Sequence, residues 1–127
     1  MKNPTNRKMF IISYIHGKWS EYYKILDKLP KNCLSLQLGD FGYGFAGYPY
    51  PKVLPKNHYF FRGNHDNPQI CRDHPNYAKD YGMWNGVFIV AGAHSIDKDQ
   101  RTPQIDWWPD EQLSLDQTHY WPLSNLY

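Results

Sequence analysis

Side chains that can bind a divalent cation follow each of four apolar runs in this sequence of 127 residues. Four short stretches carry them: His16-Gly17, Gly39-Asp40, Gly63-Asn64-His65-Asp66 and His94-Ser95-Ile96-Asp97. Imidazole, carboxylate and amide oxygen together suit ions such as Mn, Fe, Ni or Zn. Glycine beside them lets the backbone turn sharply and approach a ligand. Each stretch alone is an ordinary turn, but the same placement after four apolar runs indicates a metal site.

The apolar runs predict the elements that must position these side chains. We expect strands over residues 9–14, 33–38, 58–61 and 86–93, the last covered on both faces, and a helix over 19–29 ended by Pro30. The stretch 41–56 is rich in Gly and Pro and predicts a long loop; 101–109 predicts another, and 110–115 one helical turn. This order indicates an α/β layered domain with a partly parallel sheet, whose ligands gather beyond the carboxyl ends of the strands.

Composition restricts the class of protein. A chain of 127 residues with 41% hydrophobic and 20% charged residues predicts one domain over residues 1–127. No apolar run approaches the roughly 18 residues of a membrane span, so we expect no membrane partner and a cytoplasmic location. A net charge of +2 without a basic block argues against non-specific nucleic-acid binding, but a nucleotide substrate remains possible. Cys33 and Cys71 are expected to be free thiols.

Aromatic residues make up 17% of the chain, and many lie in polar stretches. Aromatic side chains outside a core often form partner surfaces, although a small domain can also pack its loops with them. Tyr43, Trp107 and Trp108 are therefore candidate binding residues, with a place in the core as the equal alternative for the two tryptophans.

The motifs resemble those of the calcineurin-like metallophosphoesterase family, in its phage and bacterial form. The matching pieces are Ile15-His16-Gly17, Gly39-Asp40 and Arg62-Gly63-Asn64-His65-Asp66, followed by AGAHSIDKDQR and DWWPDEQLS, so the resemblance covers residues 9–114. It implies a layered sheet with helices and a two-metal centre for phosphoester hydrolysis. His16 would bind the first metal, Asp40 would bridge both and Asn64 would bind the second. By the same resemblance His65 would be the general acid or charge stabiliser, oriented by Asp66.

The sequence departs from the family pattern in two ways. Tyr14 occupies the place of the first Asp ligand, and the C-terminal Gly-His-x-His motif is absent, so the C-terminal part of the family fold is expected to be missing. His119 stands too early in the sequence to take the place of that motif. Two divalent cations about 3.5 Å apart repel by roughly 19 kcal/mol at an effective dielectric of 20, which a single matched carboxylate does not offset. We therefore expect one divalent ion at His16, Asp40 and Asn64, with substitution by His94 or Asp97 as the weaker alternative.

Three functional hypotheses follow. The first is a degenerate, phage- or mobile-element-encoded metallophosphoesterase-like protein with lost or weak catalysis, acting as a binding or inhibitor protein. Its partner would be another protein or a second copy, met through an open sheet edge and aromatic loops, with a phosphoester or nucleotide also possible. The alternative is an active phosphodiesterase or phosphatase whose metal site is reduced or completed by a second subunit. A truncated, non-functional remnant is the third.

Overall fold

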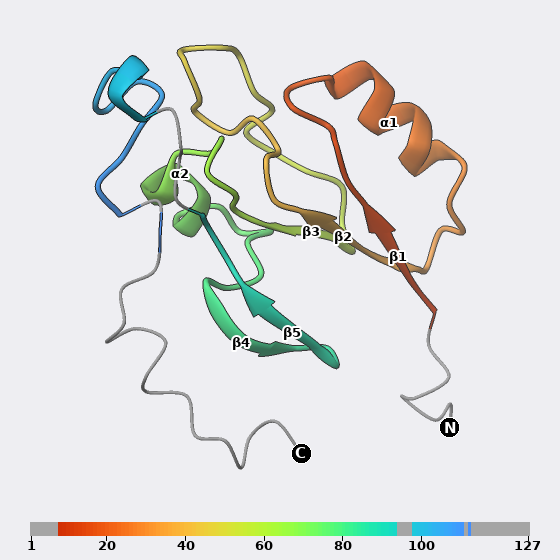
Figure 1. Cartoon of the computed structure of the whole chain (residues 1–127). Coiled ribbons are helices and arrows are strands. Elements are labelled where there is room, and N and C mark those ends of the chain that lie inside the picture. Colours follow the sequence, from red (N-terminus) through yellow and green to blue (C-terminus); the bar gives the residue numbers. More distant parts are fainter. Residues whose placement is uncertain (1–7, 94–97, 111, 113–127) are drawn as a thin grey trace.

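The computed structural model describes residues 8–93, 98–110 and 112, and a parallel three-stranded sheet lies at its centre (Figure 1). Strands β1 (Met9–Ile12), β2 (Leu34–Leu38) and β3 (His58–Phe61) are hydrogen-bonded in the order β1-β2-β3, with both pairs parallel. Helix α1 (Trp19–Asp27) connects the first two strands, and a long loop connects the second to the third. The predicted mixed α/β class is confirmed.

Two helices pack on one face of this sheet. Helix α1 buries Tyr22 and Leu26 and ends where the Lys28 amide donates to the Ile25 carbonyl and the Leu29 amide to the Leu26 carbonyl, shortly before Pro30. The one-turn helix α2 (Pro68–Arg72) begins at Asn67, whose side chain accepts hydrogen bonds from the amides of Gln69 and Ile70. The main core lies between helices, loops and sheet, and its buried members are Ile12, Ile15, Tyr22, Leu26, Phe41, Tyr43, Leu54, Phe60 and Cys71.

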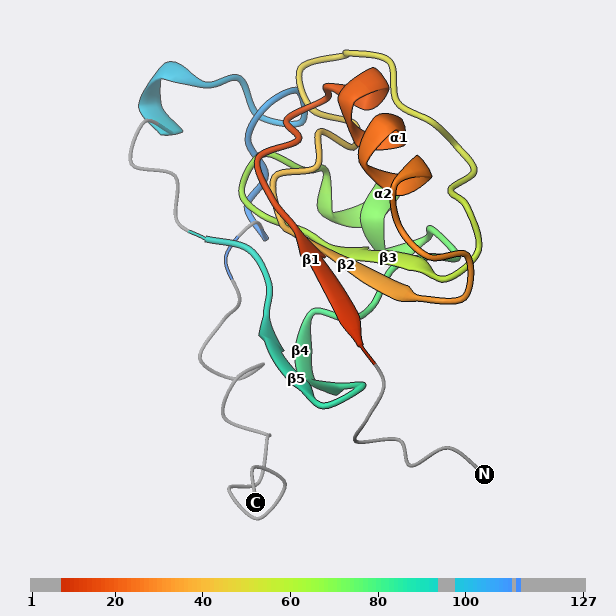
Figure 2. The ribbon, with the colours of Figure 1, turned by 90° about the vertical axis from the view of Figure 1, so that its right-hand side faces the viewer.

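The other face of the sheet carries a β-hairpin, so that the sheet lies between helices and hairpin (Figure 2). Strands β4 (Tyr81–Trp84) and β5 (Val87–Val90) are antiparallel and joined by Asn85-Gly86. Both turn residues have positive φ, as two-residue hairpin loops require. Leu36 of β2 meets Ile89 of β5 in a second, smaller core cluster. A 3-10 helix, η2 (Lys98–Gln100), follows later in the chain.

The prediction of a strand over 86–93 covered on both faces is wrong in two respects. The strand is shorter, and it pairs with β4 instead of joining the parallel sheet. Exposure alternates along β5: Ile89 is 1% exposed, while its neighbours Phe88 and Val90 are 37% and 51% exposed. A hairpin lying on a sheet buries one face only. The strand predicted over 9–14 also ends early, at Ile12, and Tyr14 has a left-handed backbone with φ of 61°.

Four further expectations concern the thiols, the sheet edge, membrane-spanning helices and the helical turn near the C-terminus. Cys33 and Cys71 are both buried free thiols, as predicted. Within the described part of the chain, β1 is hydrogen-bonded to β2 alone, so it forms an edge of the parallel sheet. No described helix is long and apolar enough to cross a membrane. The helical turn expected over 110–115 falls largely outside the described residues.

Candidate metal centre

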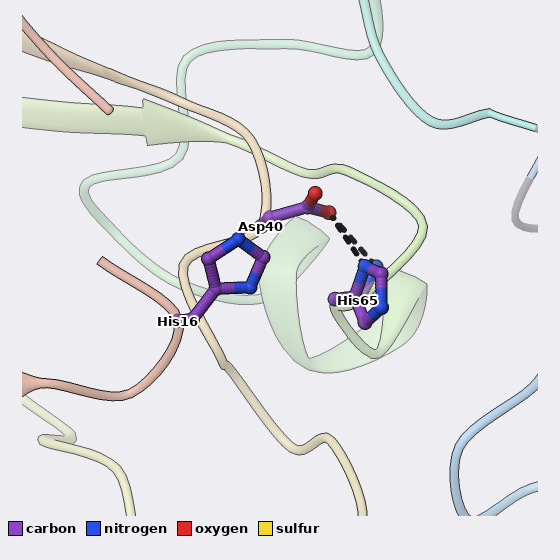
Figure 3. Close-up of side chains that lie close together, drawn as sticks. All are labelled: His16, Asp40 and His65. Atoms are coloured by element: carbon purple, nitrogen blue, oxygen red, sulfur yellow. Dashed lines mark hydrogen bonds and ion pairs between the residues drawn. The ribbon is translucent and has the colours of Figure 1, made fainter. Parts of the chain in front are cut away.

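His16, Asp40 and His65 come together at the carboxyl ends of the three parallel strands (Figure 3). Each lies in the loop that follows one strand, and parallel strands deliver those loops to the same edge of the sheet. One potential ligand atom from each residue lies within 4.8 Å of the other two. The predicted convergence after the first three strands is therefore confirmed.

The backbone of the first two loops is held in conformations that non-glycine residues rarely adopt. His16 and Asp40 have φ angles of 45° and 46°, in the left-handed region. Two hydrogen bonds connect these loops: the His16 amide donates to the Asp40 carbonyl at 3.1 Å, and the Gly17 amide to the Phe41 carbonyl at 3.0 Å. These bonds between the strained segments help to keep the side chains of His16 and Asp40 near each other.

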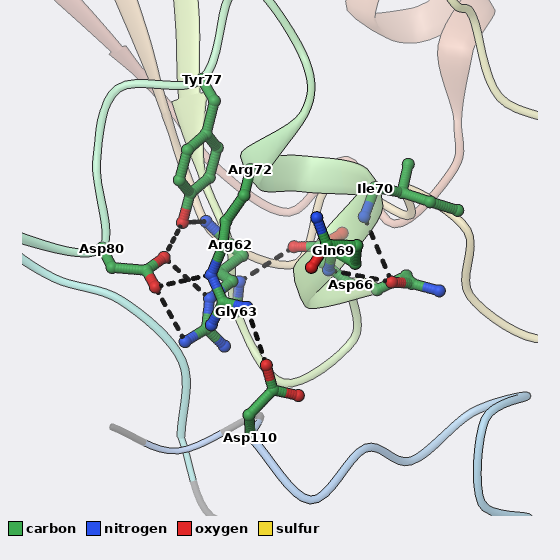
Figure 4. Close-up of polar contacts among 10 residues, drawn as sticks. Arg62, Gly63, Asp66, Gln69, Ile70, Arg72, Tyr77, Asp80 and Asp110 are labelled. Carbon is green, nitrogen blue, oxygen red and sulfur yellow. Dashed lines mark hydrogen bonds and ion pairs between the residues drawn. The ribbon is translucent and has the colours of Figure 1, made fainter. Parts of the chain in front are cut away.

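Asp66 organises the second and third loops through a completely buried carboxylate. Its oxygens accept hydrogen bonds from the amides of Phe41, Gly42 and Tyr43 at 3.1, 2.6 and 3.0 Å, and from that of Gly63 at 2.9 Å (the last is drawn in Figure 4). Burial raises the pKa of Asp66, and the four amides oppose that rise. The resemblance implies that Asp66 orients His65; these hydrogen bonds show a carboxylate that acts through the backbone of the loops.

Gly63 fits closely against Asp40. A Cβ atom at this position would lie 2.6 Å from the Asp40 amide nitrogen and even closer to its carboxylate oxygen Oδ1. Only glycine therefore lets the third loop come this near to the second. The glycine that begins the Gly63-Asn64-His65-Asp66 motif is explained by this approach of two backbones.

Asp40 and His65 form the electrostatic centre of the site. The His65 amide donates to Asp40 Oδ1 at 3.0 Å, and His65 Nδ1 lies 3.3 Å from the same oxygen. Burial alone raises the pKa of Asp40, but the hydrogen bonds from His65 and the nearby imidazoles outweigh it and lower that pKa. Contact with Asp40 in turn raises the pKa of His65. The buried Nδ1 atom of His65 has no hydrogen-bond partner among the described residues, because its approach to Asp40 lacks hydrogen-bond geometry.

Arg101 completes the surroundings of His65, and sequence reasoning did not single it out as a site residue. Its Nη2 atom lies 3.1 Å from His65 Nε2, and its guanidinium carbon lies 5.5 Å from the centre of the Phe45 ring. Its Nη1 atom donates to the Asn64 carbonyl at 3.4 Å. A guanidinium remains protonated and only donates, so in neutral His65 this contact places the ring proton on Nδ1.

The segment that carries Arg101 is anchored to the core by a network of charges (Figure 4). The carboxylate of Asp80 accepts hydrogen bonds from the buried Arg62 and from Arg72, each Nε at 2.9 Å. Arg72 also donates from Nη1 to Asp110 Oδ2 at 2.7 Å, which ties the 98–110 segment to α2. These contacts hold together parts of the chain that are far apart in sequence.

The other predicted site residues lie in different surroundings. Asn64 is half-buried beside His65, and its role as a ligand stays a prediction. Tyr43, a candidate binding residue, is instead completely buried, whereas the 3% exposure of Trp108 agrees with the alternative of a place in the core; Trp107 is half-buried. The Tyr43 ring stacks on Phe60 at 4.8 Å within the core. His94, Asp97 and His119 lie outside the described residues.

Comparison with protein-family models, with curated proteins and with solved structures gives no match for this chain. Inference about its function therefore depends on the motifs in its sequence and on the geometry of the site.

Proposed function

We propose that this chain is a degenerate metallophosphoesterase-like protein that binds one divalent cation and, beside it, a phosphoester, with hydrolytic activity lost or weak. The observation that carries this proposal is the meeting of His16, Asp40 and His65, from three separate loops, with ligand atoms within 4.8 Å of one another. Among the described residues, this is the one group of three or more histidine, cysteine or acidic side chains so placed.

The chemistry of the donors fits a single transition-metal ion. Two imidazoles and one carboxylate suit Mn, Fe, Ni or Zn, and bonds of about 2.1 Å in tetrahedral geometry would place ligand atoms about 3.4 Å apart, within reach of small side-chain movements. His65 Nδ1 is buried and lies 3.3 Å from Asp40 Oδ1, so these two atoms would bind the same ion. The side chains of Asp40 and His65 are 31% and 33% exposed, so water can complete the coordination.

Arg101 gives the site a means of holding an anion. His65 can bind a cation through the lone pair of Nδ1 only when its ring proton is on Nε2. A protonated Nε2 can no longer accept a hydrogen bond from Arg101 Nη2, which lies 3.1 Å away. In the proposed site, Nη2 would instead donate to an anionic ligand beside the cation. One divalent ion, one carboxylate and one guanidinium together leave two positive charges, which matches a phosphate dianion.

Loss of catalysis is inferred from the charge of the donor set. A bound cation would polarise the phosphoryl group and lower the pKa of a coordinated water. A second cation close by needs further anionic ligands, and Asp40 is the sole carboxylate in the group. Tyr14, at the position of the family's first Asp, is 83% exposed. A phenol is a poor substitute for a carboxylate as a metal ligand.

An active one-metal phosphodiesterase or phosphatase is the second candidate, and one observation favours it. His65 lies between Asp40 and Arg101, at 3.3 and 3.1 Å, which is an arrangement suited to proton transfer to a leaving group. In that case water would attack phosphorus and the ester P–O bond would break. Protonated His65 would give its proton to the departing oxygen and be reprotonated from solvent, which takes up the proton of the attacking water.

One experiment separates these two candidates. The metal content of the purified chain and its hydrolysis of bis(4-nitrophenyl) phosphate with Mn²⁺ are measured for wild type and His65→Ala, with Asp27→Asn as a control at an exposed carboxylate outside the site. We expect one Mn²⁺ per chain, binding of inorganic phosphate that depends on Mn²⁺, and no turnover. Turnover that requires Mn²⁺ and disappears in His65→Ala would overturn the degenerate assignment, and absence of Mn²⁺ binding would overturn the metal site itself.

A macromolecular partner remains part of the proposal. The outer edge of β1 lacks a hydrogen-bonded neighbour strand among the described residues, and the exposed aromatic rings include Tyr14 and Tyr48 at 83% and 66%. Sheet edges and exposed aromatic side chains both favour association. Light scattering over a range of concentrations tests self-association, and a Pro substitution at Ile11 in the edge strand should abolish it.

A further inference from the structure

A cavity of about 350 Å³ opens directly beside the metal centre. Its size lies at the lower end of the range for small-molecule sites. The imidazoles of His16 and His65 belong both to the cavity wall and to the metal cluster. Most of the remaining wall is apolar and comes from Trp19, Phe45, Tyr48 and Pro49. A ligand whose phosphate lies at the metal centre would therefore extend its organic group into an aromatic enclosure.

The aromatic wall is held in place by contacts among its own residues and with their neighbours. Trp19 donates from Nε1 to the Pro49 carbonyl at 3.0 Å, which joins the start of α1 to the 41–56 loop. Its ring also packs on the core residue Phe41, at 4.8 Å between centroids. The Phe45 ring lies 5.0 Å from the His65 ring and 5.5 Å from the guanidinium carbon of Arg101. These contacts help to fix the rings of Trp19 and Phe45 in the cavity wall.

From these contacts we propose that the cavity binds the flat aromatic ring of a phosphoester, either a nucleobase or an aryl group. Aromatic side chains from two segments of the chain, Trp19 in one and Phe45 and Tyr48 in the other, line the cavity, and stacking tolerates different ring systems because each has a π-face. The volume accommodates one ring system with the group that joins it to phosphate. This inference rests on the proposed phosphoester site and names the class of ligand for it.

Matched ligand pairs test the ring directly. Binding to the Mn²⁺-supplemented chain is measured by calorimetry for AMP against ribose 5-phosphate, for phenyl phosphate against methyl phosphate, and for inorganic phosphate alone. We expect the ring-bearing member of at least one pair to bind at least about fivefold more tightly than its partner. If only AMP binds more tightly than its ring-free partner, the cavity is a nucleobase site. If the ring-bearing ligand binds more tightly in both pairs, the cavity accepts aryl groups without selecting a base. Equal affinities within both pairs would overturn the proposal.

Two variants connect the preference to the cavity wall. Phe45→Leu and Tyr48→Leu keep apolar volume but remove a ring, and Tyr48 is 66% exposed, so its replacement should leave the fold intact. Both should reduce the ring preference, measured as the ratio of the two affinities within each ligand pair. Phe88→Leu, on the far hairpin, is the matched control and should leave that ratio unchanged. An unchanged ring preference in both Phe45→Leu and Tyr48→Leu would contradict the proposal that the ligand ring binds in this cavity.

The same measurements distinguish this inference from the proposed function. If inorganic phosphate and Mn²⁺ fail to bind but AMP binds more tightly than ribose 5-phosphate in a way that requires Phe45, the metal proposal fails and the aromatic site stands. If Mn²⁺ and phosphate bind but no ring preference exists, the metal proposal stands and the aromatic site fails. If no ligand binds, both are overturned.

Discussion

The backbone amide and the imidazole ring of His65 both contact the same carboxylate oxygen of Asp40. The amide nitrogen lies 3.0 Å from Oδ1 and the ring nitrogen Nδ1 lies 3.3 Å from it. Asp40 therefore positions the third loop with the same carboxylate that the proposed metal site would use as a ligand. A substitution at Asp40 would consequently affect both the proposed metal binding and the loop, so it needs controls that separate the two effects.

Asp40→Asn should weaken Mn²⁺ binding by at least about 100-fold, because the sole carboxylate of the group is replaced by a neutral amide and even second-shell losses cost 10- to 100-fold. The asparagine oxygen can still accept the hydrogen bond from the His65 amide, so the circular dichroism spectrum should be unchanged. Calorimetric titration with Mn²⁺ measures the effect. Unchanged affinity in Asp40→Asn, with Asp27→Asn also unchanged, would remove Asp40 from the ligand set.

Tyr14→Asp should increase affinity for Mn²⁺ without a cost in stability. The Tyr14 side chain is 83% exposed and its φ of 61° is a conformation that Asp and Asn adopt more readily than Tyr. Tyr14→Asn is the matched control, since it relieves the same backbone strain without adding charge. Equal Mn²⁺ affinity in the Asp and Asn variants would show that position 14 does not face the metal.

Asp66→Asn should lower the free energy of unfolding by about 3 kcal/mol or more. The buried carboxylate accepts four backbone amides, and an amide group offers one acceptor oxygen while directing N–H donors at other N–H donors. Urea denaturation measures the loss. Asp73→Asn, at an exposed carboxylate that accepts from the Gln69 side chain and whose replacement oxygen can still accept, should cost no more than about 0.5 kcal/mol. Similar losses in the two variants would contradict the organising role of Asp66.

Stability should decrease as the pH falls below about 6.5, partly because of His58. Burial lowers the pKa of His58 below its usual value near 6.5, so between the two values the unfolded chain binds more protons. The stabilising contribution is therefore present above pH 6.5 and is lost as the pH falls through the folded pKa. Burial also lowers the pKa of His74, so His74 likewise reduces stability as the pH falls. The raised pKa of His65 has the opposite effect on stability.

His58→Asn isolates that contribution, because the asparagine side chain can still meet Ser35 Oγ, which lies 2.6 Å from His58 Nδ1. The slope of unfolding free energy against pH between pH 5 and 7 should be shallower in the variant than in wild type. An equal slope would assign the acid sensitivity to other groups.

Local sequence signals predicted the parallel sheet well. The strand over His58–Phe61 was predicted with its observed bounds, and the other two parallel strands to within two residues. Continuous apolar runs and the spacing of Gly and Pro are local properties, so they can be read along the chain. The meeting of His16, Asp40 and His65 followed from the rule that ligands gather at the carboxyl ends of parallel strands.

The remaining features depend on contacts between distant segments. Arg101 contacts His65 because the 98–110 segment folds back towards the site and is held there by the contact between Asp110 and Arg72. The residues around position 101 do not by themselves predict that the segment folds back. The helix at Pro68 was missed although Asn67-Pro68 is a recognisable start signal. Tyr43 lies in a polar, glycine-rich loop that gave no sign of its complete burial.

The parallel arrangement of β1, β2 and β3 also bears on the order of events during folding. The residues at positions 16, 40 and 65 come together only after two crossovers have closed, and such non-local pairings are slow and late, whereas the β4–β5 hairpin is local. A divalent ion then finds its complete set of donors only in the nearly finished structure. At about 100 times its dissociation constant it adds about 2.7 kcal/mol. That gain should appear as unfolding about 100-fold slower, with the rate of refolding unchanged.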